Sequence, residues 1–182
     1  MKGPPVITIP DSLWNEMLDV FEQIPRGVER VAYFDGIRYT GADGASHGVT
    51  TTLVVPHATL RPRNYDISAE AMAEAGAHLH PNGLSRLLQV HTHGNDWVDH
   101  SRTDDTLAFT RRTGAVSIVL PHHAHHRPIP LEGGVHVRRR DGWQRAHGDD
   151  AAALVRLVPG MRDLRPTLGP KRSFWGRLLW NR

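Results

Sequence analysis

The sequence contains no cysteine among its 182 residues. Disulfide bonds, thiol nucleophiles and cysteine-based zinc fingers are therefore excluded, and the composition agrees with a reducing compartment. No apolar run approaches the roughly 20 residues that span a bilayer, and the stretch Met1–Pro5 lacks the apolar core of a signal peptide. We expect a cytoplasmic protein without a transmembrane segment.

Length and charge predict one domain followed by a basic segment. A chain of 182 residues, 39% of them hydrophobic, can build one core but not two large ones. We place this domain at residues 1–160. Residues 161–182 hold six basic residues and one acidic residue, and we expect either a basic tail that docks on a partner or an anionic membrane, or a terminal helix packed on the domain. Nucleic acid is not an expected partner, because the basic residues gather in this short segment.

Short strand patterns alternate with helical patterns along the chain. The sequence predicts strands at 6–9, 86–90 and 115–120, helices at 11–24, 68–79 and 103–112, and hairpins pairing 29–39 with 49–55 and 134–140 with 143–145. Strands mixed with helices on both sides of a single sheet indicate an α/β domain.

Two histidines follow the apolar strand pattern at 86–90. His91 and His93 are two positions apart, and residues with this spacing on a strand face the same side. Catalytic zinc usually takes three protein ligands and keeps one position for water, so this pair needs one further ligand. Asp104 is our candidate.

Ser101 and Asp104 also have the spacing of a helix capping box. In that interpretation Ser101 is the N-cap and Asp104 is the third residue of the following helix. The two roles are compatible, because a cap would fix the direction of the carboxylate.

The pattern His-Thr-His, seven residues, Ser-x-x-Asp resembles the JAMM motif of the JAB/MPN metalloprotease family. That motif includes an upstream glutamate, which matches Glu29 here, followed by Ala32 and Gly36 at the family's small and glycine positions. Many members have proline and glycine after the second histidine, whereas this chain has Gly94 and Asn95. The resemblance implies a single MPN (JAB) domain with a curved mixed β-sheet flanked by α-helices, a cytidine-deaminase-like fold.

The resemblance also implies a reaction. One catalytic Zn²⁺ would be held by His91, His93 and Asp104, with Glu29 as the base and Ser101 as the oxyanion donor. The implied activity is an isopeptidase or peptidase that cuts at the C-terminus of a ubiquitin-like protein, in bacteria alongside E1-like and E2-like partners that include antiphage conjugation systems. Two alternatives stay open: a peptidase that processes a sulfur-carrier precursor, and a non-catalytic MPN scaffold.

A second histidine cluster lies outside this motif. The segment His122–His126 holds four histidines and follows the strand pattern at 115–120. It is interpreted as a solvated or substrate-facing loop, an adventitious metal binder or a specific second metal site. The sequence leaves these three open.

Overall fold

The computed structural model describes residues 6–42, 44–106 and 108–160. Ten strands, four α-helices and two 3₁₀ helices lie in these residues. In chain order they are β1 (Val6–Pro10), α1 (Asp11–Gln23), β2 (Val31–Thr40), β3 (Ser46–Val54), β4 (Thr59–Arg61), β5 (Asn64–Asp66), α2 (Ala69–Gly76), β6 (Ser85–Thr92), α3 (Arg102–Thr106), β7 (Val116–Leu120), η1 (His122–Ala124), η2 (Pro130–Glu132), β8 (Gly134–Arg139), β9 (Gly142–Ala146), α4 (Gly148–Leu154) and β10 (Val155–Val158).

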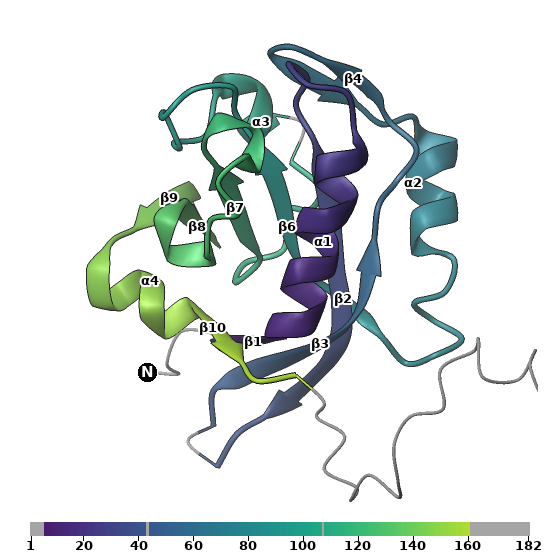
Figure 1. Cartoon of the computed structure of the whole chain (residues 1–182). Coiled ribbons are helices and arrows are strands. Elements are labelled where there is room, and N and C mark those ends of the chain that lie inside the picture. The colour runs from purple at the N-terminus through teal and green to yellow at the C-terminus, as the bar shows by residue number, and fades with distance from the viewer. Residues whose placement is uncertain (1–5, 43, 107, 161–182) are drawn as a thin grey trace, which may run out of the picture.

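Eight of the strands form one curled sheet (Figure 1), in the order β10-β1-β3-β2-β6-β7-β8-β9. β1 pairs in parallel with β10 and β3, β6 pairs in parallel with β7, and the other neighbours are antiparallel. The remaining strands, β4 and β5, form a separate hairpin. The mixed α/β class predicted from the sequence is confirmed.

One face of the sheet is apolar and forms the main core. Alternate residues of the central strands, such as Phe34, Val90 and Ile118, point to this face and are fully buried. Helix α1, which crosses in front of the sheet in Figure 1, covers the core with Trp14, Met17, Leu18 and Phe21. Helix α4 adds Ala151 and Leu154 to the same cluster.

The opposite face carries buried polar side chains. Gln89 and His91 of β6, Ser117 of β7 and His136 of β8 are all at most 5% exposed. The strand register brings them together, because Gln89 pairs with Ser117 and Ser117 pairs with His136. Buried polar groups destabilise a fold unless they are hydrogen-bonded, so this face is where a functional site is expected.

A buried arginine connects the end of α1 to the start of β2. Arg30 is a buried residue, with only 1% of its surface exposed. It donates hydrogen bonds of 2.8 to 3.2 Å to four backbone carbonyls, those of Phe21, Ile24, Pro25 and Val28. These carbonyls lie at the end of the helix, where partners for free carbonyl groups are needed and positive charge is favourable. Arg30 thereby fixes the backbone beside Glu29.

The predicted helix at 103–112 is largely wrong. Helix α3 begins at Arg102 and ends at Thr106, and residues 108–112 are not helical. The aromatic ring of Phe109 packs near those of Tyr33 and Trp143, at centroid distances of 5.8 and 6.2 Å. These tertiary contacts outweigh the weak helical pattern, because a short helix gains little stability by itself.

The other predicted strands and helices are present, with shifted ends. The expected strand 86–90 extends over Ser85–Thr92, and the expected helix 68–79 is limited to Ala69–Gly76. Three elements were not predicted from the sequence: the β4–β5 hairpin, helix α4 and strand β10. The predicted tail, 161–182, lies outside the described residues. Within the part of the chain that the structure describes, no helix is long and apolar enough to cross a membrane.

Replacing Arg30 by methionine tests the role of this buried guanidinium. We expect Arg30→Met to lower the free energy of unfolding by about 3 kcal/mol or more, because four carbonyls lose their charged donor. Arg127→Met is the matched control: Arg127 also binds α1, through ion pairs of 2.8 Å to Asp19 and Glu22, but is exposed. Such pairs contribute at most about 1 kcal/mol. Urea denaturation measures both, and equal losses would contradict the assignment.

Candidate metal centre

His91 and His93 lie on the polar face at the end of β6. His91 pairs with Val31 of β2 and Val119 of β7. The N–H of His93 donates to the carbonyl of Leu120 at 2.9 Å, so the strand geometry continues past Thr92. The two rings lie 5.3 Å apart. The prediction that these histidines face the same side is confirmed.

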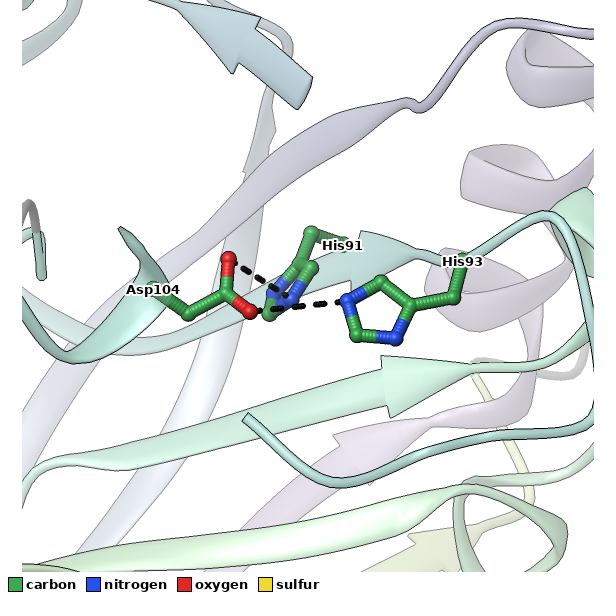
Figure 2. Close-up of side chains that lie close together, drawn as sticks. All are labelled: His91, His93 and Asp104. Atoms are coloured by element: carbon green, nitrogen blue, oxygen red, sulfur yellow. Dashed lines mark ion pairs between the residues drawn. The ribbon is translucent and has the colours of Figure 1, made fainter. Parts of the chain in front are cut away.

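Asp104 reaches this pair from the first turn of α3. Its carboxylate oxygens lie 3.5 Å from Nε2 of His91 and 3.4 Å from Nε2 of His93 (Figure 2). The capping box is also present: the N–H of Ser101 donates to Asp104 at 2.6 Å, and the N–H of Asp104 donates to Ser101 Oγ at 3.1 Å. The cap therefore directs the carboxylate toward the histidines.

The spacing of these three side chains suits a tetrahedral metal ion. Ligand atoms 2.0–2.1 Å from such an ion lie about 3.3 Å from one another, and Asp104 comes close to this separation from each imidazole through a different oxygen, Oδ1 toward His91 and Oδ2 toward His93. Nε2 of His91 is buried and has no hydrogen-bond partner among the described residues. A metal ion would satisfy this atom. His91, His93 and Asp104 are also the only described group of three such side chains whose ligand atoms converge within 4.8 Å.

Neighbouring groups orient both imidazoles. The Nδ1–H of His93 donates to the carbonyl of Trp97 at 2.9 Å, which leaves the Nε2 lone pair directed at the site. Trp97 also stacks on the ring of His93. The amide group of Gln89 lies 3.4 Å from Nδ1 of His91 and contacts the hydroxyl of Tyr65. The amide nitrogen of Gln89 makes both of these contacts, so Gln89 holds the Nδ1 side of the His91 ring.

The electrostatics of the site favour an ionised carboxylate. Burial by itself raises the pKa of Asp104, but the adjacent imidazoles of His91 and His93 and the hydrogen bond from the N–H of Ser101 hold that pKa well below its usual range. Burial lowers the pKa of His93, whereas its bonds to Asp104 and to the Trp97 carbonyl raise it, and the net shift is upward. A negative Asp104 between two imidazoles is a suitable set of ligands for a divalent cation.

Glu29 and Ser101 line the same cleft as His93 and Asp104. The cleft has a volume of about 470 Å³ and is bounded by Glu29, Pro62, Arg63, Asn64, His93, Gly94, Asn95, Trp97, Ser101 and Asp104. Burial raises the pKa of Glu29 to about 7, His93 opposes this rise and Asp104 adds to it. A carboxyl group with a pKa near neutrality can both accept and release a proton.

Backbone contacts hold Glu29 at the edge of the cleft. Its N–H donates to the carbonyl of Arg61 at 2.8 Å. The N–H of the next residue, Arg30, donates to Thr92 Oγ1 at 3.0 Å, and the N–H of Thr92 donates back to the carbonyl of Arg30 at 3.1 Å. The segment containing the predicted base is thus tied directly to the strand containing the histidines.

Several supporting residues were not predicted from the sequence. Gln89 had a usable signal, since it is a polar residue two positions before His91 in an otherwise apolar strand. Trp97 orients His93 through its backbone carbonyl, which no side-chain pattern reveals. Tyr65 comes from the unpredicted β4–β5 hairpin.

The histidine cluster at His122–His126 packs behind the site. The N–H of His123 donates to the carbonyl of His93 at 2.7 Å. A Cβ on Gly94 would lie 2.9 Å from Nε2 of His123, so this ring occupies the space that a larger residue 94 would need. The cluster does not form a second group of three converging metal ligands in the part of the chain that is described. Its closeness explains why residue 94 is a glycine.

Comparisons with known proteins support the fold. No protein-family model matches this sequence, and no curated protein matches it. The structure is similar to the solution structure of protein DSY2949 from Desulfitobacterium hafniense, with a TM-score of 0.62 and 17% sequence identity over 86% of this chain and 95% of that chain. At this identity the similarity concerns the fold alone.

The buried ring of His136 predicts a pH dependence of stability. Burial lowers its pKa to about 3, whereas an unfolded histidine has a pKa of about 6.5. Between these two pKa values the His136 ring binds a proton only in the unfolded chain. Its contribution to the free energy of unfolding is therefore complete above about pH 6.5 and decreases as the pH falls. Between about pH 7 and pH 5, the free energy of unfolding should drop by about 2 kcal/mol more in the native protein than in His136→Phe. Urea denaturation with a chelator present measures this difference, and parallel pH profiles would contradict it.

Proposed function

We propose that this protein is a zinc-dependent isopeptidase or peptidase of the JAMM type, which cleaves at the C-terminus of a ubiquitin-like modifier. One observation carries the proposal: ligand atoms of His91, His93 and Asp104 converge within 4.8 Å of one another, beside a cleft that Glu29 and Ser101 line. The curled mixed sheet, with α1 and α4 packed on its apolar face, supports an MPN-type, cytidine-deaminase-like domain.

Glu29 is the proton carrier in this proposal. Zinc, when bound, supplies a Lewis acid that polarises the scissile carbonyl and makes water more acidic. Glu29 takes a proton from the attacking water and transfers it to the leaving amine as the amide bond breaks. Its pKa of about 7 suits both transfers, because the ionised and neutral forms are both available near neutral pH.

Ser101 has a hydroxyl proton that remains available to substrate. Its Oγ already accepts the N–H of Asp104 at 3.1 Å, which fixes the oxygen and leaves the O–H free to donate. The developing negative charge on the carbonyl oxygen needs such a donor, which typically lowers the barrier by about 3 kcal/mol. Ser101 therefore combines a capping role with oxyanion stabilisation.

The resemblance to JAMM enzymes supplies the substrate class. The leading substrates are conjugates of a ubiquitin-like protein. The leading partners are E1-like and E2-like proteins of a bacterial antiphage system. The retained set of Glu29, His91, His93, Ser101 and Asp104 favours an enzyme over a non-catalytic scaffold. A sulfur-carrier precursor presents the same kind of bond to the same groups, so it is the second substrate to assay.

Replacing Glu29 by glutamine tests the proton transfer. Glu29→Gln should lower kcat/KM on ubiquitin-like fusion substrates by about 10²- to 10⁴-fold, because the base is lost, while bound zinc stays at the native level. Glu74→Gln, an exposed change on α2, is the control and should keep full activity. Native turnover by the Glu29 variant would overturn the assignment.

Replacing Ser101 by alanine separates its two roles. We expect Ser101→Ala to lower kcat by about 10²- to 10³-fold and stability by about 1 kcal/mol. Ser68→Ala is the matched control, since Ser68 caps α2 by accepting the N–H of Ala71 at 3.2 Å. That variant should lose similar stability and keep its kcat. A kcat loss in Ser101→Ala no larger than that of Ser68→Ala would reject the oxyanion role.

A further inference from the structure

Helix α3 brings Ser101 and Asp104 to the site but has few contacts of its own. It extends only from Arg102 to Thr106, and none of its residues is buried. A helix of this length is unstable without tertiary contacts. The capping box fixes Ser101 and Asp104 relative to each other, yet it does not attach the turn to the sheet. Besides the contacts of Asp104 with the two histidines, a further group holds this turn beside the sheet.

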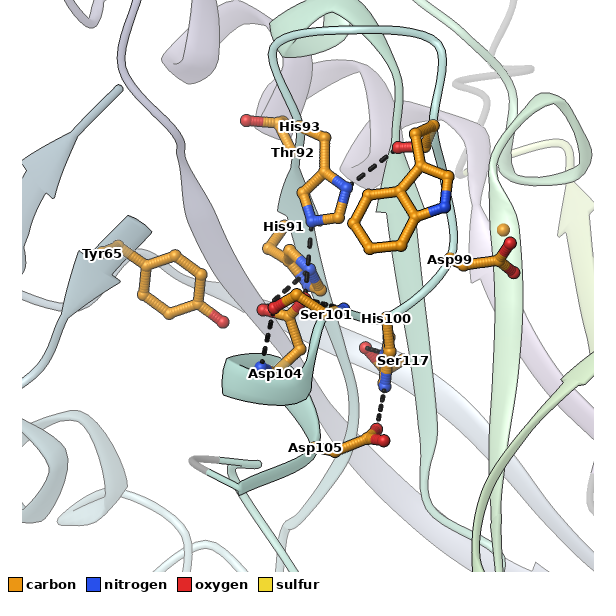
Figure 3. A network of polar contacts seen from close by, with 12 residues as sticks. Tyr65, His91, Thr92, His93, Asp99, His100, Ser101, Asp104, Asp105 and Ser117 are labelled. Atoms are coloured by element: carbon orange, nitrogen blue, oxygen red, sulfur yellow. Dashed lines mark hydrogen bonds and ion pairs between the residues drawn. The ribbon is translucent and has the colours of Figure 1, made fainter. Parts of the chain in front are cut away.

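His100, the residue before Ser101, makes this attachment. Its Nδ1 lies 3.0 Å from Oδ1 of Asp105 on α3, and its Nε2 lies 3.0 Å from Oγ of Ser117 on β7 (Figure 3). A carboxylate can only accept, so Nδ1 carries the proton and Nε2 accepts the hydroxyl proton of Ser117. One neutral ring thus connects the helical turn to the strand next to β6.

The ring of His100 is also packed on two further strands. It stacks on His136 of β8, with centroids 4.0 Å apart, and meets the edge of Trp143 of β9 at 5.1 Å. The side chain is only 6% exposed. On the other side, its ring lies 5.8 Å from that of His91. His100 is therefore held between the metal-binding strand and the far edge of the sheet.

The order Ser117, His100, Asp105 has the connectivity of a serine hydrolase triad, but its surroundings exclude that chemistry. Ser117 is 2% exposed, and it is not among the residues that line the cleft. A nucleophile must reach substrate. The chain of hydrogen bonds therefore serves to place a backbone segment.

We propose that His100 is a positioning residue, which fixes the Ser101–Asp104 turn so that the Asp104 carboxylate meets His91 and His93. This inference rests on the metal site of the proposed function. Outer-shell groups of this kind commonly change metal affinity by about 10- to 100-fold. Neither of its two hydrogen bonds involves a residue that contacts substrate in the proposed mechanism.

The test measures metal binding without substrate. Full-length native protein, His100→Phe and His136→Phe are titrated with Zn²⁺ in competition with a chromophoric chelator, and with Co²⁺ while the visible absorption is followed. Each variant removes one ring of the stacked His100–His136 pair, but only His100 contacts Asp105 and Ser117. We expect His100→Phe to bind zinc at least about tenfold more weakly and to lose intensity in the cobalt band, as Asp104 leaves the ion. His136→Phe should retain both properties.

Native affinity in His100→Phe, or an equal loss in His136→Phe, would overturn the proposal. If His100→Phe does not fold, the variants Asp105→Asn and Ser117→Ala replace it, because both keep the His100 ring in place. Weaker zinc binding in both variants supports the inference. Native zinc binding in both rejects it. A native chain that binds zinc but cleaves no ubiquitin-like substrate would contradict the proposed reaction and leave this test intact. A native chain that binds no zinc would overturn both.

Discussion

The carboxylate of Asp104, held between two imidazoles, is the interaction on which the site depends. A carboxylate that is largely shielded from water is unfavourable unless it is paired and hydrogen-bonded. Here His91, His93 and the N–H of Ser101 supply those partners. Because the three groups come from the end of β6 and from the turn before α3, this one charge connects two parts of the chain that the sheet alone would not join.

The geometry around this carboxylate is held from several sides. Arg30 closes the end of α1 and ties its own backbone to Thr92, which places Glu29 at the rim of the cleft. The carbonyl of Trp97 fixes the tautomer of His93. On the far side, His100 attaches the α3 turn to β7. Each of these contacts is buried or partly buried, so solvent competes with them only weakly.

The sequence predicted local patterns well and tertiary choices less well. The strand ending at His91 and the cap at Ser101 follow from local rules of spacing and hydrogen bonding, and both are present. The helix expected at 103–112 ends at Thr106 because Phe109 packs on aromatic rings from distant strands. No local pattern contains that contact.

The residues of the candidate site were also predictable where a local pattern defines them, and not where distant strands meet. Four of the five predicted site residues line one cleft, and the fifth, His91, converges with His93 and Asp104. The role of His100 could not be assigned from sequence, because it depends on which strands become neighbours. Those neighbours are set by long-range pairing in the sheet.

Zinc content per chain tests the central claim most directly. Elemental mass spectrometry on untagged native protein, beside His93→Ala and Asp104→Ala, measures it without assuming a substrate. His123→Ala serves as a control for metal held by the His122–His126 cluster. The account predicts one zinc per native chain and per His123→Ala chain, and loss of zinc in the other two variants. Zinc that survives both His93→Ala and Asp104→Ala, or its absence from the native protein, would contradict it.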